Sequence, residues 1–74
     1  MDMNLSKREK EVLRLLFFSY AEIAEKLFIQ PSTAKTHGNR ILEKLSCKTK
    51  GAAVIKAIKQ GLIDIEEVEI DERG

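Results

Sequence analysis

The chain has 74 residues, enough for one small domain; 43% of them are hydrophobic and 34% are charged. That balance is typical of a globular domain and differs from the composition of disordered chains. No apolar run approaches the roughly 20 residues that span a membrane, and the first residues lack a signal-peptide hydrophobic region. Cys47 is the only cysteine, which excludes an internal disulfide. We therefore expect a cytoplasmic domain with no membrane contact, no cofactor and no small-molecule ligand.

The net charge of +1 conceals two parts of opposite sign. Residues 64–74 contain six acids and one base, whereas residues 1–63 contain twelve bases and six acids. Within the basic part, residues 31–59 carry seven lysines and arginines and a single acid, Glu43. A basic surface is typical of phosphate-binding proteins, although lysine-rich solvated faces are also common in small domains. We take residues 1–63 as the folded domain and residues 64–74 as an acidic tail.

Two capping boxes predict where the first two helices begin. Residues 6–9 and 19–22 both read Ser-x-x-Glu, in which each side chain can bond to the backbone of the other residue. Apolar residues at helical spacing follow each box, at 12, 13, 15 and 16 and then at 23, 24 and 27. We expect Phe17, Phe18 and Phe28 to belong to the core; the alternative is an exposed aromatic partner site.

A third helix is predicted from Pro31 to Leu45. Proline fits the first position of a helix, where its missing N–H has no partner. One stripe of this helix is apolar, whereas the outward face is polar, mostly short-chained and net positive. That face comprises Ser32, Thr33, Lys35, Thr36, Asn39, Arg40 and Glu43, with His37 at its boundary.

A fourth helix is predicted between Thr49, a plausible N-cap, and Gly61, a glycine placed to end a helix. Its apolar residues cover more than one face, and two interpretations remain open. Either one face closes the core and the rest is ordinary exposure, or an alanine and isoleucine strip pairs with its copy in a homodimer. The residues assigned to that dimer are Ala53, Val54, Ala57 and Ile58.

The acidic tail alternates isoleucine and valine with carboxylates. A single strand has no partner here, and chain ends usually fray, so we expect disorder. We favour a solubilising role over a self-inhibitory one, in which the tail would fold back on the basic helix and mimic DNA.

The second and third predicted helices, joined by a tight turn, are typical of a helix-turn-helix. A helix fits the major groove of B-DNA when its outward side chains carry donors and acceptors that can meet base edges. The third helix meets this requirement. The predicted fold is therefore all-α, a four-helix bundle containing a helix-turn-helix.

The sequence resembles the LuxR/GerE family of bacterial DNA-binding domains. The similar segments are residues 5–16, 22–29, 33–45 except Gly38, and 52–63, in the family's order. The resemblance implies binding to promoter DNA, with the third helix in the major groove and the fourth forming a homodimer contact. Gly38 stands where the family usually has valine, and the link that contains Phe17 and Phe18 is about two residues shorter than usual.

Carried over position by position, the resemblance gives Lys35, Thr36 and Asn39 as base contacts. It places Thr33, His37, Lys44 and Lys48 at positions that contact the DNA backbone or support the local structure. It places Glu9 where the family has an acid that braces the helices. Ser32, Arg40 and Lys50 complete the predicted contacts with the DNA backbone.

The leading hypothesis is a sequence-specific regulator of transcription that binds double-stranded DNA, as a homodimer on DNA. The alternative is a protein-interaction module with the same fold, which binds RNA polymerase or another regulator without intrinsic DNA binding. We do not expect an enzyme, because no paired carboxylates with a base, glycine-rich phosphate loop or metal-ligand spacing is present. The sequence fits both a stand-alone regulator and the output domain of a longer one.

Overall fold

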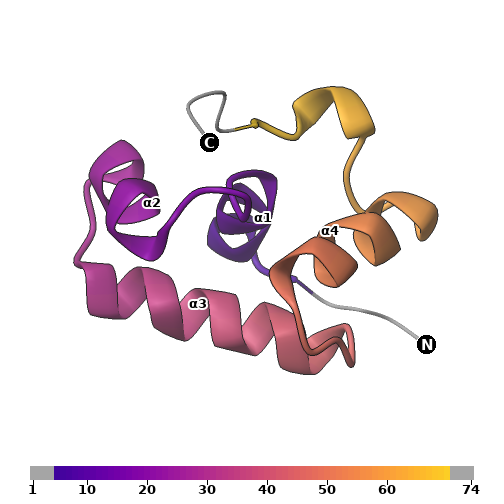
Figure 1. Ribbon diagram of the computed structural model, residues 1–74, viewed down its shortest axis with the longest axis horizontal. Helices are drawn as coiled ribbons and strands as arrows, with labels where there is room; N and C mark the ends of the chain where they lie inside the picture. Colours follow the sequence, from indigo (N-terminus) through magenta and orange to yellow (C-terminus); the bar gives the residue numbers. More distant parts are fainter. Residues whose placement is uncertain (1–4, 71–74) are drawn as a thin grey trace.

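The structure is a computed structural model that describes residues 5–70. It consists of α1 (Lys7–Arg14), α2 (Tyr20–Leu27), α3 (Pro31–Lys44) and α4 (Lys50–Lys59), followed by a short 3-10 helix, η1 (Ile65–Glu67). In Figure 1, α1 is seen end-on at the centre, α3 runs along one side of it, and α2 and α4 flank it. The predicted class, all-α with four helices, is confirmed, and the described residues contain no strand.

Side chains cap three of the helices at the predicted residues. The Ser6 hydroxyl accepts from the Glu9 amide at 3.0 Å, and the Glu9 carboxylate accepts from the Ser6 amide at 2.9 Å. The box at Ser19 is formed in the same way, and the Thr49 hydroxyl accepts from the amide of the third residue of α4. Each cap satisfies amide groups that a helix leaves unpaired in its first turn.

Three helices end with a residue in the left-handed backbone conformation. Gly61 adopts it after α4, with φ 75°, as expected from its position. Ser46 after α3 and Phe28 after α2 also adopt it, with φ 55° and 58°. This conformation costs an L-residue roughly 1–2 kcal/mol, and glycine avoids that cost. The turn between α2 and α3 is therefore made by a residue that is strained there.

The core is formed by apolar residues from all four helices and from the segments beside them. Its buried members are Leu5, Val12, Leu13, Leu15, Leu16, Phe18, Ile23, Ala24, Ala34, Ile41, Leu45, Ala53, Val54, Ala57 and Ile63. Two aromatic residues expected in the core are outside it. Phe17 is 45% exposed, whereas its neighbour Phe18 is buried, and Phe28 is 94% exposed at the point where the chain leaves α2.

The predicted dimer strip of α4 needs a correction. Ala53, Val54 and Ala57 have at most 1% of their surface exposed, because this side of α4 closes the core, and Ile58 is half-buried. Buried residues cannot contact a second copy while the domain stays folded. The exposed apolar residues of α4 are Ala52 and Ile55.

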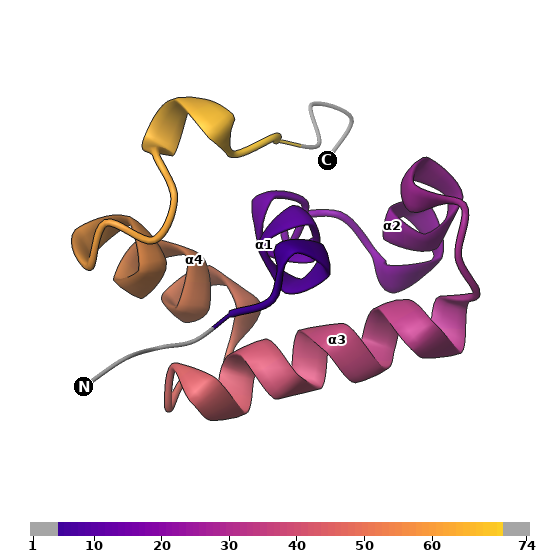
Figure 2. The same ribbon diagram turned by 180° about the vertical axis from the view of Figure 1, so that it is seen from behind.

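The beginning of the acidic tail is ordered, in contrast to the expected disorder. The Glu69 amide donates to the Arg14 carbonyl at 3.0 Å, and the Arg14 guanidinium lies 3.6 Å from the Glu67 carboxylate. Ile63 is buried and Val68 packs against the core, which explains why this segment stays on the domain. Figures 1 and 2 show residues 64–70 on the far side of α1 from α3, so they do not cover the outer face of α3. Residues 71–74 lie outside the described part.

The described residues include no helix that is long and apolar enough to cross a bilayer.

The Tyr20 side chain of α2 packs on Gly38 of α3. A Cβ atom at this position would lie 2.5 Å from Cε1 and 2.7 Å from Cζ of Tyr20, closer than real Cβ contacts come. The Tyr20 ring therefore occupies the volume that a larger residue at position 38 would need. This pairing of a large residue with a small one explains a departure from the family pattern noted in the sequence.

We predict opposite effects of Gly38→Ala in two backgrounds. In the otherwise unchanged protein it should lower the free energy of unfolding by at most about 1 kcal/mol, because the added methyl displaces the end of the flexible Tyr20 side chain from its contacts. In Tyr20→Ala protein the same change should raise the free energy of unfolding by up to about 1 kcal/mol, because alanine favours a helix over glycine. Urea unfolding of the four proteins measures both effects; the same sign in both backgrounds would contradict the assigned contact.

Candidate nucleic-acid interface

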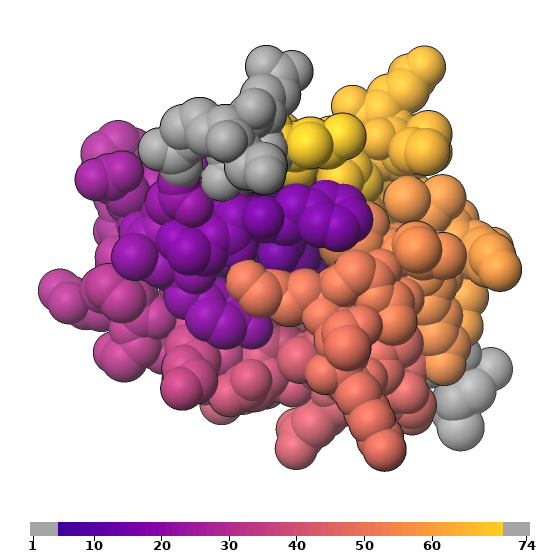
Figure 3. All heavy atoms as spheres, viewed as in Figure 1, coloured from indigo at the N-terminus to yellow at the C-terminus, as the bar shows by residue number. Residues whose placement is uncertain are grey.

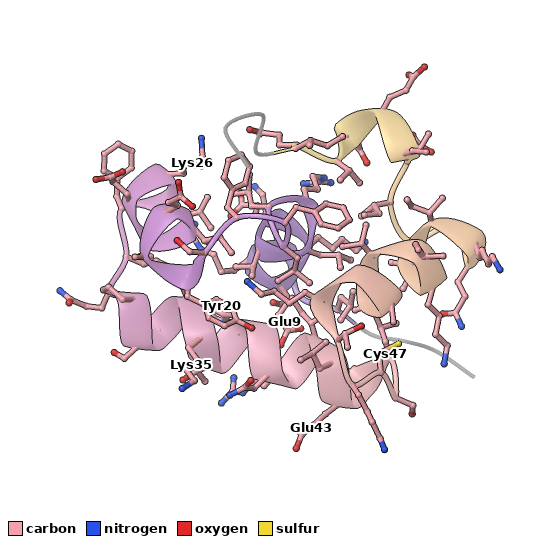
Figure 4. The ribbon with its side chains drawn as sticks, viewed as in Figure 1. Glu9, Tyr20, Lys26, Lys35, Glu43 and Cys47 are labelled. Carbon is pink, nitrogen blue, oxygen red and sulfur yellow. The ribbon has the colours of Figure 1, made fainter. Side chains whose placement is uncertain are left out.

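The outward face of α3 carries the predicted contact residues with their side chains in solvent. Lys35, Thr36 and Asn39 are exposed. Ser32, Thr33 and Arg40, predicted to contact the DNA backbone, are exposed on the same helix. Figure 4 shows Lys35 and Glu43 pointing away from the other helices. The helix thus offers donors and acceptors over more than two turns without an apolar interruption.

The first turn of α3 is open to an anion. Gln30 is the N-cap residue, its side chain makes no capping bond, and the first turn contains no acid. The amides of Ser32 and Thr33 belong to the first turn, where a helix has no internal acceptors. Such an end attracts phosphate through its N–H groups and its partial positive charge.

The hydroxyl of Thr36 is directed by a bond within the helix. It donates to the Ser32 carbonyl one turn earlier, at 3.0 Å. Its oxygen keeps acceptor capacity, but its only proton is used. Thr36 can therefore offer a methyl group and an acceptor to a base.

A buried carboxylate connects α1 to the C-terminal half of α3. The Lys44 ammonium donates to Glu9 Oε1 at 2.8 Å, the same oxygen that accepts from Ser6, and Glu9 is only 3% exposed. Burial alone would raise the pKa of Glu9. The bonds from Lys44 and Ser6, with the positive charges of Lys44 and His37, outweigh it and bring the pKa below its usual range. The predicted bracing role of Glu9 has a geometric basis here.

Two lysines of α4 are also held by the protein itself. Lys56 donates to the Leu45 carbonyl at the end of α3, at 2.7 Å. Lys50 donates to the Phe18 carbonyl at 2.9 Å, and its Nζ lies 4.4 Å from the centre of the Tyr20 ring. Burial lowers the pKa of Lys50 and raises that of Tyr20.

The remaining predicted residues differ in accessibility. Lys48 is exposed in the loop after α3. His37 is half-buried, and within the described part its Nδ1 is buried and has no hydrogen-bond partner. Cys47 is half-buried, with its Sγ bonded to the Leu45 carbonyl at 3.4 Å. In residues 5–70 no histidine, cysteine and carboxylate group is arranged to hold a metal ion.

Sequence reasoning missed Tyr20, which the structure places against α3. The signal was present at Gly38: a glycine in mid-helix, where the family has a larger residue, requires either a cavity or a neighbour that fills it. Which neighbour fills it depends on the tertiary fold.

Comparisons with known proteins show the family of this chain. The family described as bacterial regulatory proteins, luxR family, matches residues 3–57. The chain is 43% identical over 60 residues to YxjL of Bacillus subtilis, named an uncharacterized transcriptional regulatory protein. It is 45% identical over 62 residues to the probable transcriptional regulatory protein NarL of Mycobacterium tuberculosis and to the oxygen regulatory protein NreC of Staphylococcus carnosus.

These matches cover 78–81% of this chain but only 28–29% of the relatives' length. No solved structure gave a significant match.

The bond between Glu9 and Lys44 predicts how stability depends on pH. Because the pKa of Glu9 is lower in the folded state than its ordinary value of 4.5, ionised Glu9 stabilises the fold above about pH 4.5. This stabilisation is lost as the pH falls through the folded-state pKa. Glu9→Gln should lower the free energy of unfolding at pH 7 by about 1–3 kcal/mol, and the difference from wild type should shrink below pH 4.5.

Unfolding by urea between pH 3 and 7 measures this difference. Glu43→Gln is the matched control, because Glu43 is exposed on the outer face of α3. A constant difference between Glu9→Gln and wild type across the whole range would contradict the assignment.

Proposed function

Because the chain belongs to the luxR family of bacterial regulatory proteins, we propose that it recognises specific sequences in double-stranded DNA with α3 in the major groove. The observation that carries this proposal is the division of α3 into two faces. Its inner residues Ala34, Gly38 and Ile41 are buried, whereas its outer face carries only polar and charged side chains. A groove-binding helix needs this combination of a fixed inner face and an open polar one.

Lys35, Thr36 and Asn39 are the proposed base-reading residues. Lys35 and Asn39 are one helical turn apart and can enter the groove together. Lysine donates to guanine, asparagine pairs with adenine, and the threonine methyl packs on the methyl of thymine.

The proposed contacts to the DNA backbone fall into two groups. Ser32, Thr33, Arg40 and Lys48 are exposed, so their side chains reach phosphates directly, with the free amides of α3. His37 is half-buried and Lys44 is bound by Glu9, so they contribute charge or support from behind the interface. Lys50 is half-buried and donates to the Phe18 carbonyl, and its remaining protons can reach a phosphate.

The proposal includes a homodimer on DNA. Each copy would occupy a half-site, with centres about 34–36 Å apart, one turn of DNA. The contact would use the exposed residues Ala52 and Ile55 of α4 and the edge of Ile58, in place of the buried residues assigned from the sequence. This apolar strip is small, so we expect DNA to be needed to hold the two copies together.

Fluorescence anisotropy with random and selected duplexes, at roughly 50 and 200 mM salt, tests the function. Affinity should fall steeply between the two salt concentrations. Lys35→Ala and Asn39→Ala should each cost about 1–3 kcal/mol on the selected site and less on random DNA. Lys48→Ala should weaken both equally. No binding at either salt would favour the interaction module, and equal losses for all three variants would remove the base-reading role.

The internal bond of Thr36 predicts what this residue reads. If its methyl group contacts a thymine, Thr36→Val should keep the affinity of the selected site, whereas Thr36→Ser should lose about 1 kcal/mol, the value of one buried methyl. Replacing that thymine by uracil should weaken the wild-type and valine proteins but not the serine variant. A loss with valine, and none with serine, would show that the hydroxyl is read instead.

A further inference from the structure

The end of the Tyr20 side chain lies across α3. Its ring lies against Gly38, where even one methyl group would overlap it. The side chain is only half-buried, so solvent and ligands can reach it. In Figure 4, Tyr20 lies over α3.

Lys50 brings a positive charge to the same place. Its ammonium lies 4.4 Å from the centre of the Tyr20 ring, and one of its three protons is donated to the Phe18 carbonyl at 2.9 Å. Two protons remain for another acceptor. Because the carbonyl and the ring both hold the ammonium, its position is set before any ligand arrives. Figure 3 shows that side chains of the first two helices and the start of α4 adjoin on this face, beside α3.

This pair stands beside the base-reading residues. Gly38 and Lys35 are three residues apart and so adjacent on the helix surface. The DNA backbone passes along the flanks of a helix in the major groove, and the first helix of a helix-turn-helix crosses it. Tyr20 is the first residue of α2, the helix that occupies this place in the motif.

We propose that the Tyr20 hydroxyl and the Lys50 ammonium together bind one phosphate of the DNA backbone, beside the base that Lys35 reads. This inference rests on the proposed function. A phosphate can accept hydrogen bonds from a neutral and a charged donor at once. This contact would fix the position of α3 along the groove. Gly38 then serves a binding role as well as a packing role, because it lets the tyrosine reach the flank of α3.

Tyr20→Phe is the decisive variant, because it removes only the hydroxyl and keeps the ring that packs on Gly38. It should weaken binding to selected and random DNA alike by about tenfold, the value of one hydrogen bond to a charged group. The salt dependence should not change, because no charge is lost. Lys50→Gln should reduce the slope of log affinity against log salt by about 0.9. Thermal unfolding should be the same for Tyr20→Phe and wild type.

Replacing single phosphates by neutral methylphosphonates locates the contact. A methylphosphonate at one position of the DNA should weaken binding by wild type and by the control variant Lys48→Gln. The same methylphosphonate should have little further effect on binding by the double variant Tyr20→Phe, Lys50→Gln. If Tyr20→Phe binds like wild type, and no position behaves in this way, the inference is overturned, while Lys35→Ala still tests the proposed function. If wild type binds no DNA, the proposed function and this inference both fail.

Discussion

The contact between the Tyr20 ring and Gly38 links α2 to α3. Because position 38 has no side chain, the Tyr20 ring lies directly on the backbone of α3. Lys50 then covers the ring and bonds to the Phe18 carbonyl in the link between α1 and α2. The contacts among Gly38, Tyr20, Lys50 and the Phe18 carbonyl thus connect α2, α3, α4 and the short link.

Two further contacts fix the other half of α3. Lys44 is bound by the buried Glu9 of α1, and the Leu45 carbonyl at the helix end accepts from Lys56 of α4. Three of the seven basic residues between 31 and 59, namely Lys44, Lys50 and Lys56, are therefore bound within the fold. The other four, Lys35, Arg40, Lys48 and Lys59, are exposed. A count of basic residues overstates the binding surface, because part of the hydrogen-bonding capacity of the three bound lysines is used within the protein.

Local signals in the sequence predicted most of the fold. The capping boxes at Ser6 and Ser19, the N-cap Thr49, the first-turn Pro31 and the terminal Gly61 act over a few residues, and each was confirmed. The outward face of α3 followed from helical periodicity. The errors arose where tertiary packing decides. Ala53, Val54 and Ala57 could face either the core or a partner, and only the position of α4 shows that they face the core.

The exposure of Phe17 and the packing of the tail also depend on the tertiary fold, which the sequence patterns do not give. Phe18 is buried and Phe17 is 45% exposed, and the sequence contains no rule that selects Phe18. Residues 64–70 were expected to be disordered because a single strand has no partner and chain ends fray. The bond from the Glu69 amide to Arg14 and the packing of Val68 against the core hold them on the domain. Tyr20 was missed as a site residue because its neighbour Gly38 is 18 positions away in the chain.

The central claim is that α3, held from behind, is the surface that meets DNA. Chemical-shift mapping of backbone amides during titration with a selected duplex tests it directly. We expect the largest shifts in α3, at Ser32 to Arg40, with smaller ones at Tyr20 and Lys50 and none in residues 64–70. Shifts concentrated in α2 or residues 64–70, with α3 unchanged, would contradict the account.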